Sequence, residues 1–354
     1  MPRFAKLTLA VAASGLTVAV LAGAVLSAGD ETAPRTDQLS PATAKPEGKP
    51  VVLAFGGDVH FEGVLGSRLA ANVAGVLQPI EPVFRQADLS VVNLETAVTG
   101  GGSPTAKAFV FRAPATAFAA LRGGGIDVAS MANNHGLDYG ETGLRDSLAA
   151  AKRYRFPVVG IGLNAEQAYR PFRHTISGQR IAVIGATQVL DDELVSAWTA
   201  GPGKPGLASA KDVPRLLQEV RAARKTSDTV VVFLHWGIEL QQCPSSDQRT
   251  LARRLVAAGA DVVVGGHAHR VQGAGRMRNA LVGYGLGNFV WYGTSELSTQ
   301  TGVLLVTVNG RRVVSYRWVP ARIVDGVPRP LTGSARRSEL ASWRSLRGCT
   351  GLKP

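Results

Sequence analysis

Cysteine is almost absent from this 354-residue sequence, which contains only Cys243 and Cys349. Two thiols cannot build a metal site from thiolates alone, so that class of site is excluded. In an oxidising compartment the pair can close a disulfide between Cys243 and Cys349, and the alternative is two unrelated thiols.

Acidic residues are scarce as well: 26 Asp and Glu stand against 39 Lys and Arg, which gives a formal net charge of +13 at pH 7. On an exported protein this balance favours an anionic cell-surface polymer or lipid as partner, and nucleic acid is not expected. A merely solvated surface is the alternative. The arginines are concentrated near the end of the chain, at Arg311, Arg312, Arg317, Arg322, Arg329, Arg336, Arg337, Arg344 and Arg347.

Charged residues are missing from residues 7–28, directly after Arg3 and Lys6. A basic start followed by an apolar run is typical of an export signal. The run also reaches the roughly 20 residues that a membrane-spanning helix needs. We therefore expect a signal peptide or N-terminal membrane anchor over residues 1–28, a flexible linker over residues 29–50, and a protein that is secreted or anchored to the outer face of the cytoplasmic membrane.

Apolar runs that resemble buried strands alternate with helical patterns, as in an α/β protein. After His269 the predicted strands follow one another without helices, which indicates antiparallel pairs that complete the sheet. We expect one folded domain over residues 51–325 and a basic, poorly patterned tail over residues 326–354. The main predicted strands are 51–57, 89–92, 126–131, 229–234, 262–264, 280–284, 302–308 and 312–319, and the main predicted helices are 141–155, 211–225 and 245–258.

Five of the six histidines come just after these apolar runs, and only His174 does not. Because the carboxyl ends of parallel strands meet at one edge of a sheet, polar residues placed there converge. Asp58 and Glu95 follow two further runs. Ordinary hydrogen-bonded histidines are the alternative for each position, but their shared placement favours a metal site. The five are His60, His135, His235, His267 and His269.

Imidazoles combined with carboxylate and amide oxygens suit manganese, iron or zinc. Two divalent ions about 3.5–4 Å apart need a bridging carboxylate and separate nitrogen or oxygen ligands. Such a pair activates water and offsets the charge of a transferring phosphoryl group. The sequence therefore predicts two divalent metal ions whose identity is open.

Five short motifs occur in a fixed order and carry a family resemblance. They are GDVH (57–60), NLE (93–95), NNH (133–135), HWG (235–237) and GHAH (266–269). In this order they resemble the calcineurin-like metallophosphoesterase superfamily. The longer stretches NLETAV, ANNHGLDYG, GGHAHRVQ and GLGNF are similar to the CapA-type family associated with capsule and poly-γ-glutamate biosynthesis. The resemblance implies a two-sheet α/β sandwich flanked by helices, an α-β-β-α fold.

The resemblance also implies a role for each residue. Asp58, His60 and His269 would hold one metal, and Asn134, His235 and His267 the second. Glu95 would bridge both metals, where the superfamily usually has aspartate.

His135 would donate a proton to the leaving group. The superfamily generally has an acidic residue directly after this histidine, but here Gly136 follows and Asp138 is the nearest carboxylate. Asp138 is therefore the expected partner of His135.

Two functions remain open at this stage. The first is a metal-dependent hydrolase, phosphoesterase-like, that acts on a phosphoester or a polymer at the cell surface. The second is a weakly catalytic or non-catalytic accessory component that binds an anionic polymer for its synthesis or export. Poly-γ-glutamate is the first candidate polymer by the resemblance, and a membrane synthesis or export complex is the expected protein partner.

Overall fold

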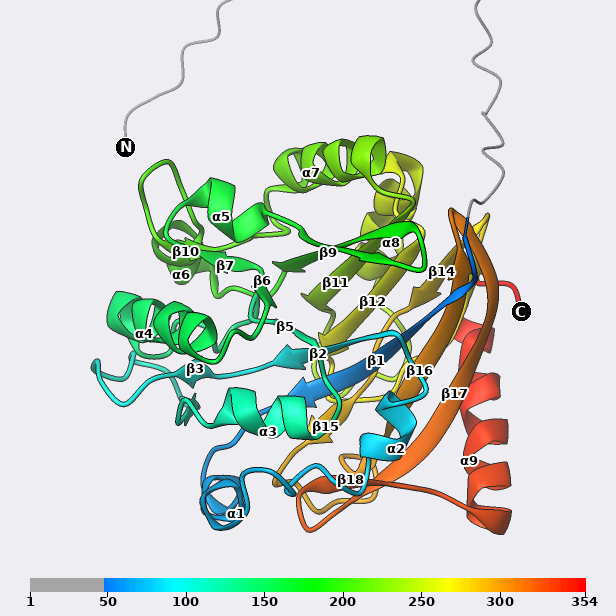
Figure 1. The fold of residues 1–354 in the computed structure, drawn as a ribbon, viewed down its shortest axis with the longest axis horizontal. Helices are drawn as coiled ribbons and strands as arrows, with labels where there is room; N and C mark the ends of the chain where they lie inside the picture. The colour runs from blue at the N-terminus through cyan, green and yellow to red at the C-terminus, as the bar shows by residue number, and fades with distance from the viewer. Residues whose placement is uncertain (1–47) are drawn as a thin grey trace, which may run out of the picture. The chain divides into compact units, whose positions relative to one another are not determined.

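The computed structural model describes residues 48–354, which form two β-sheets packed face to face (Figure 1). Helices cover the outer face of each sheet, so the two-sheet α/β sandwich predicted from the sequence is confirmed. Within residues 48–354, no helix combines the length and the apolar character that crossing a membrane requires. The predicted signal peptide or anchor and most of the predicted linker lie outside the described residues.

The first sheet has β1 near its middle, between β2 and β16. β1 runs parallel to β2 and antiparallel to β16, and β15 (Asn288–Val290) pairs in parallel with the last residues of β1. This arrangement buries β1 on both edges. The strand order is β18 (Val327–Pro330), β17 (Arg312–Val324), β16 (Gln300–Asn309), β1 (Val51–Val59), β2 (Leu89–Leu94), β5 (Val128–Ser130) and β6 (Val158–Val159).

The second sheet is parallel at its centre, where β9, β11, β12 and β14 lie side by side. β8 and β9 form an antiparallel hairpin around Ser177 and Gly178. Two short pairs, β3–β4 (Ala97–Val98, Arg112–Ala113) and β7–β10 (Ile161–Gly162, Gly206–Leu207), stand apart from both sheets. The strand order is β13 (Ala274–Met277), β14 (Ala280–Gly283), β12 (Val262–His267), β11 (Thr229–Trp236), β9 (Gln179–Thr187) and β8 (Phe172–Ile176).

Three apolar layers hold the sandwich together. The middle layer lies between the sheets, where fully buried side chains such as Phe55 and Phe233 meet. One outer layer joins the first sheet to α1 (Val64–Ala71), α2 (Glu81–Phe84), α3 (Ala117–Gly123), α4 (Gly140–Arg153) and α6 (Asp192–Trp198). The other joins the second sheet to α5 (Ala165–Tyr169), α7 (Val213–Thr226) and α8 (Ser246–Ala258).

The C-terminal segment, expected to be a basic, poorly patterned tail over residues 326–354, has regular structure. It forms β18, α9 (Gly333–Ser345) and a 3₁₀ turn (Leu346–Cys349). Trp343 of α9 is 7% exposed and stacks on Trp318 of β17, with ring centroids 5.6 Å apart. One buried residue leaves little helical periodicity in the sequence, which explains the missed helix.

The predicted disulfide between Cys243 and Cys349 is confirmed, with the two Cα atoms 5.7 Å apart. It joins the loop that follows β11 to the end of the 3₁₀ turn. The C-terminal segment is thus fastened both by packing and by a covalent bond.

Candidate metal centre

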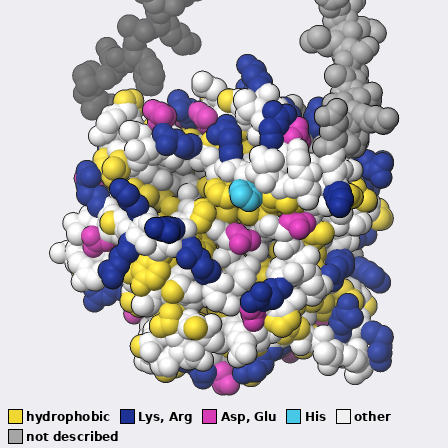
Figure 2. Space-filling view, viewed as in Figure 1, with side chains coloured by type: hydrophobic (Ala, Val, Ile, Leu, Met, Phe, Trp, Pro, Cys, Tyr) yellow, Lys and Arg dark blue, Asp and Glu magenta, His cyan; other side chains and the backbone are white. Residues whose placement is uncertain are grey.

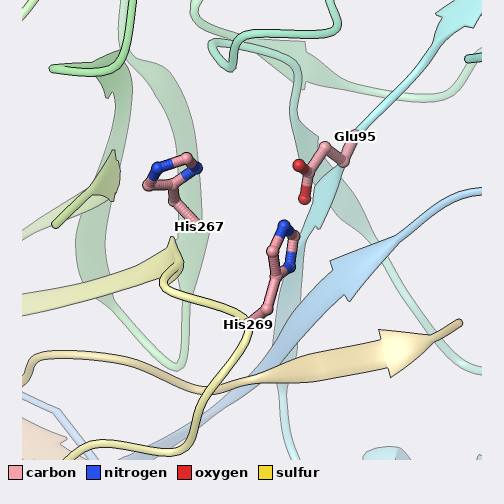
Figure 3. Close-up of side chains that lie close together, drawn as sticks. All are labelled: Glu95, His267 and His269. Atoms are coloured by element: carbon pink, nitrogen blue, oxygen red, sulfur yellow. The ribbon is translucent and has the colours of Figure 1, made fainter. Parts of the chain in front are cut away.

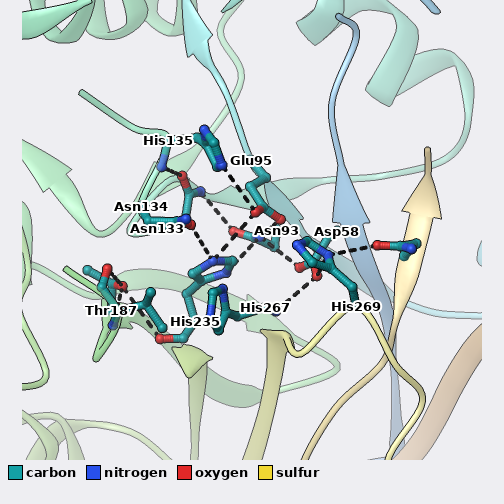
Figure 4. Close-up of polar contacts among 12 residues, drawn as sticks. Asp58, Asn93, Glu95, Asn133, Asn134, His135, Thr187, His235, His267 and His269 are labelled. Carbon is teal, nitrogen blue, oxygen red and sulfur yellow. Dashed lines mark hydrogen bonds and ion pairs between the residues drawn. The ribbon is translucent and has the colours of Figure 1, made fainter. Parts of the chain in front are cut away.

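The residues predicted to bind metal gather where strands of both sheets end (Figure 4). Asp58 lies near the end of β1, and Glu95 directly follows β2. His235 and His267 come from the ends of β11 and β12 in the second sheet. The first sheet therefore supplies the carboxylates, and the second sheet supplies most of the imidazoles.

The loop after β12 has an unusual backbone. His267 and His269 have φ values of 88° and 51°, a region that non-glycine residues seldom adopt. A Cβ atom at Gly266 would collide with Oδ1 of Asp58, so only glycine fits between the strand end and that carboxylate. The backbone N–H of His267 donates to Oδ2 of Asp58 at 2.9 Å. Strain of this kind is typical of functional loops.

Two groups of three side chains place ligand atoms within 4.8 Å of one another. The first is Glu95, His267 and His269 (Figure 3), and the second is Asp58, Glu95 and His235. Glu95 belongs to both groups, as a bridging carboxylate would. These groups place His267 with His269, and His235 with Asp58. The resemblance instead implies that His269 shares a metal with Asp58 and that His267 shares one with His235.

His60 belongs to neither group and lies in an aromatic enclosure beside the centre. Phe111 stacks on its ring at 4.6 Å, and Trp291 and Tyr292 meet it edge-on at 4.4 and 4.8 Å. The backbone N–H of Glu62 bonds Nδ1 of His60 at 3.2 Å. The opposite nitrogen, Nε2, is buried and has no hydrogen-bond partner in the described chain, so it is free to bind a ligand.

Asn134 contacts the centre through its side-chain oxygen. Its Oδ1 lies 2.8 Å from Nε2 of His235, and the same nitrogen lies 3.6 Å from Oε1 of Glu95. The amide oxygen thus lies among the atoms that would surround a metal.

Burial controls the charge of the centre. Burial raises the pKa of Asp58 to about 7 and raises the pKa of Glu95 well above its ordinary value, with the nearby Asp58 adding to the effect. Burial lowers the pKa of His60 and His267 to about 3 and that of His269 to about 4. The imidazoles are therefore neutral at physiological pH, which is the form that binds metals.

Three buried atoms of the centre lack any hydrogen-bond partner within residues 48–354: Oε1 of Glu95, Nε2 of His60 and Nδ1 of His267. Each is a metal-ligand atom by type. An unsatisfied buried polar atom is unfavourable, so a cation among these atoms would relieve the cost. The residues present therefore fit a divalent transition metal.

His135 lies beside the centre and is held by Asp138, the carboxylate predicted to pair with it. Nδ1 of His135 is 2.5 Å from Oδ2 of Asp138, and Nε2 lies 3.9 Å from Oε1 of Glu95. Burial lowers the pKa of His135, while the Asp138 carboxylate opposes that effect. Phe111 stacks on the imidazole at 4.0 Å and closes one side of it.

Lys107 is a residue that the sequence analysis missed. Its Nζ donates to the Asp138 carboxylate at 2.6 Å and also to the backbone carbonyl of Asn134. The backbone N–H of Phe111 donates to the same carboxylate at 2.7 Å. The loop that carries Lys107 has no periodic pattern, so no sequence signal pointed to it.

Asparagines form a second set of contacts that the sequence analysis did not assign. Nδ2 of Asn93 donates to Oδ1 of Asp58 at 2.8 Å, and Nδ2 of Asn133 donates to Oδ1 of Asn93 at 3.0 Å. Oδ1 of Asn288 lies 2.8 Å from Nδ1 of His269. All three lie within recognised motifs, and their amides orient the ligands as supporting residues of metal sites do.

Comparison with known proteins agrees with this geometry. Residues 52–292 match the family described as bacterial capsule synthesis protein PGA_cap. The chain is 32% identical over 229 residues to the capsule biosynthesis protein CapA of Bacillus anthracis, covering 62% of this chain and 54% of that protein. It is 31% identical over 263 residues to the PGA biosynthesis protein CapA of Bacillus subtilis strain 168, covering 72% of this chain and 67% of that protein. The chain thus spans about half to two thirds of these relatives.

Among solved structures, a hypothetical protein from Thermus thermophilus aligns with a TM-score of 0.50 and 19% identity. The alignment covers 77% of this chain and 100% of that one. At this identity the likeness concerns the fold alone.

Proposed function

Because the chain belongs to the bacterial capsule synthesis protein PGA_cap family, we propose that it acts in capsule or poly-γ-glutamate biosynthesis as a metal-dependent hydrolase at the cell surface. The relatives whose names mention capsule and PGA biosynthesis support the pathway. The centre at the strand ends supports the chemistry.

One observation carries the hydrolase proposal: buried ligand atoms from both sheets converge without hydrogen-bond partners in the described chain. An unsatisfied buried polar atom costs about 1–3 kcal/mol, so a fold that keeps three of them together needs a compensating ligand. Two divalent ions would supply activated water and offset negative charge on the substrate. The residues that would hold them are Asp58, Glu95, His235, His267 and His269, with His60 and Asn134 completing the set.

The side chains beside the centre would handle the proton. His135 presents Nε2 towards the centre, 3.9 Å from Oε1 of Glu95. Asp138 fixes the ring by accepting a hydrogen bond from Nδ1, and Lys107 holds Asp138 in place. His135 would therefore donate the proton from Nε2 in its imidazolium form, which the Asp138 carboxylate favours, and the other two residues position the ring.

Export and polymer binding belong to the same proposal. The Cys243–Cys349 disulfide is compatible with an oxidising compartment outside the cytoplasm. Figure 2 shows Lys and Arg side chains gathered along the edge of the molecule where α9 lies in Figure 1. Single exposed ion pairs contribute only about 0–1 kcal/mol, so an anionic polymer would need many contacts and its binding should weaken as salt rises.

The test is turnover of a phosphodiester and of poly-γ-glutamate by the full chain loaded with manganese. We expect the His135→Ala variant to lose about 10²- to 10⁴-fold in rate while it keeps its manganese. His174→Ala is the matched control, since His174 is exposed on β8, away from the centre. If the manganese-loaded protein binds the polymer but cleaves neither substrate, the hydrolase proposal fails and the accessory role replaces it.

A further inference from the structure

A cavity of about 330 Å³ lies outside the metal centre, between α9 and the loop that follows His269. We call it the Arg270 cavity. Its walls include Arg270 and Val271, Leu297 before β16, Gln300 at the start of β16, and Ser342 and Trp343 from α9. This volume is in the range of small-ligand sites.

Arg270 supplies an uncompensated positive charge to this cavity. Its Nε is buried and has no hydrogen-bond partner within residues 48–354. Glu339 also lines the cavity, but Oε2 of Glu339 already pairs with Arg322 at 3.2 Å. No carboxylate in the described part of the chain forms an ion pair with Arg270. The cavity therefore suits an anionic group.

The disulfide fastens two walls of the cavity to each other. Gln242, adjacent to Cys243, and Leu346, in the 3₁₀ turn that ends at Cys349, both line the cavity. Trp343 is held from behind by Trp318. A site whose walls are fixed before binding loses less entropy when a ligand enters.

We propose that the Arg270 cavity binds a carboxylate group of an anionic polymer. A guanidinium forms two parallel hydrogen bonds to a planar carboxylate, and the Ser342 hydroxyl and the Gln300 amide add donors. Arg270 directly follows His269, so the cavity lies close to the metal centre. This proposal specifies how the protein of the proposed function would bind its polymer, and it rests on that function for the identity of the polymer.

The experiment is calorimetric titration of the purified full chain, with its disulfide intact, by the dipeptide γ-glutamyl-glutamate. We expect Arg270→Gln to weaken binding by about tenfold or more, because a charge-assisted pair is lost. Arg270→Lys should also weaken it, since lysine keeps the charge but cannot form the two parallel bonds. Ser342→Trp should block the cavity without touching the arginine. Arg254→Gln, at an exposed arginine of α8, is the matched control.

Unchanged affinity in both Arg270→Gln and Ser342→Trp would overturn the proposal. Inorganic phosphate that displaces the dipeptide at equal concentration would overturn the preference for carboxylate. Manganese content is measured in the same samples. Dipeptide binding that depends on Arg270 in a manganese-treated protein that cleaves neither substrate would leave the cavity standing and reject the hydrolase. Metal uptake and turnover without dipeptide binding would reject the cavity alone.

Discussion

Replacing both members of the Cys243–Cys349 disulfide by serine should lower the free energy of unfolding substantially. The bond joins residues 106 positions apart, so it closes a long loop in the unfolded chain. In the chain-entropy model a loop of this length corresponds to about 5 kcal/mol at 25 °C. That figure is an upper limit for the double variant.

The folded C-terminal segment should remain attached when the disulfide is removed. Trp343 stays stacked on Trp318, and backbone N–H groups of Arg276 and Lys353 donate to each other's carbonyl oxygens at 2.7 and 3.0 Å. Because these contacts are independent of the sulfur atoms, the loss should appear as lower global stability. We expect about 2–5 kcal/mol.

Urea unfolding of both proteins without reductant, followed by tryptophan fluorescence, measures this difference as a lower free energy of unfolding extrapolated to water. The slope should rise in the variant, because an unfolded chain without the cross-link exposes more surface. Non-reducing mass spectrometry verifies the bond in the starting protein. Treating the unsubstituted protein with reductant should reproduce both changes. A loss below about 1 kcal/mol, with the bond verified, would refute the view that this cross-link stabilises the fold by restricting the unfolded chain.

Three further predictions concern the metal centre and α9. Glu95→Gln should reduce both bound metals together, because a shared oxygen loses its charge; elemental analysis that finds only one metal lost would show that Glu95 does not bridge. Burial raises the pKa of Asp58 to about 7, so a proton competes with the metal for this carboxylate below neutrality. Manganese affinity should therefore fall by about tenfold for each pH unit below about 7. An affinity independent of pH between about 5 and 7 would contradict this. Trp343→Ala should cost about 3–5 kcal/mol in urea unfolding, and an unchanged midpoint would show that α9 does not depend on this contact.

The strand ends of the centre were predictable because their signal is local. A buried parallel strand reads as a short apolar run, and whatever polar residue follows it must appear at the edge of the sheet. His235 and His267 follow this rule directly. The supporting asparagines lay within other motifs of the resemblance, so their positions were visible even though their hydrogen bonds were not.

The contacts that were missed depend on tertiary structure. Lys107 reaches Asp138 from a loop without periodicity, and nothing in the nearby sequence marks a lysine that will be buried against a carboxylate. The aromatic enclosure of His60 joins Phe111 and Trp291, which are far apart in the chain. α9 escaped prediction because a helix that packs with one tryptophan leaves almost no periodic pattern.

The position of β1 also determines when the fold can form. Although β1 comes first among the described strands, Val51 pairs with Val308 and Asp58 pairs with Asn288. While the polypeptide is being made, one edge of β1 has no partner until the ribosome has passed residue 309, and such an apolar edge invites aggregation. Contacts between residues so far apart in sequence form slowly. A chain that ends before β16 is complete would therefore contain every predicted metal ligand and still lack a metal centre.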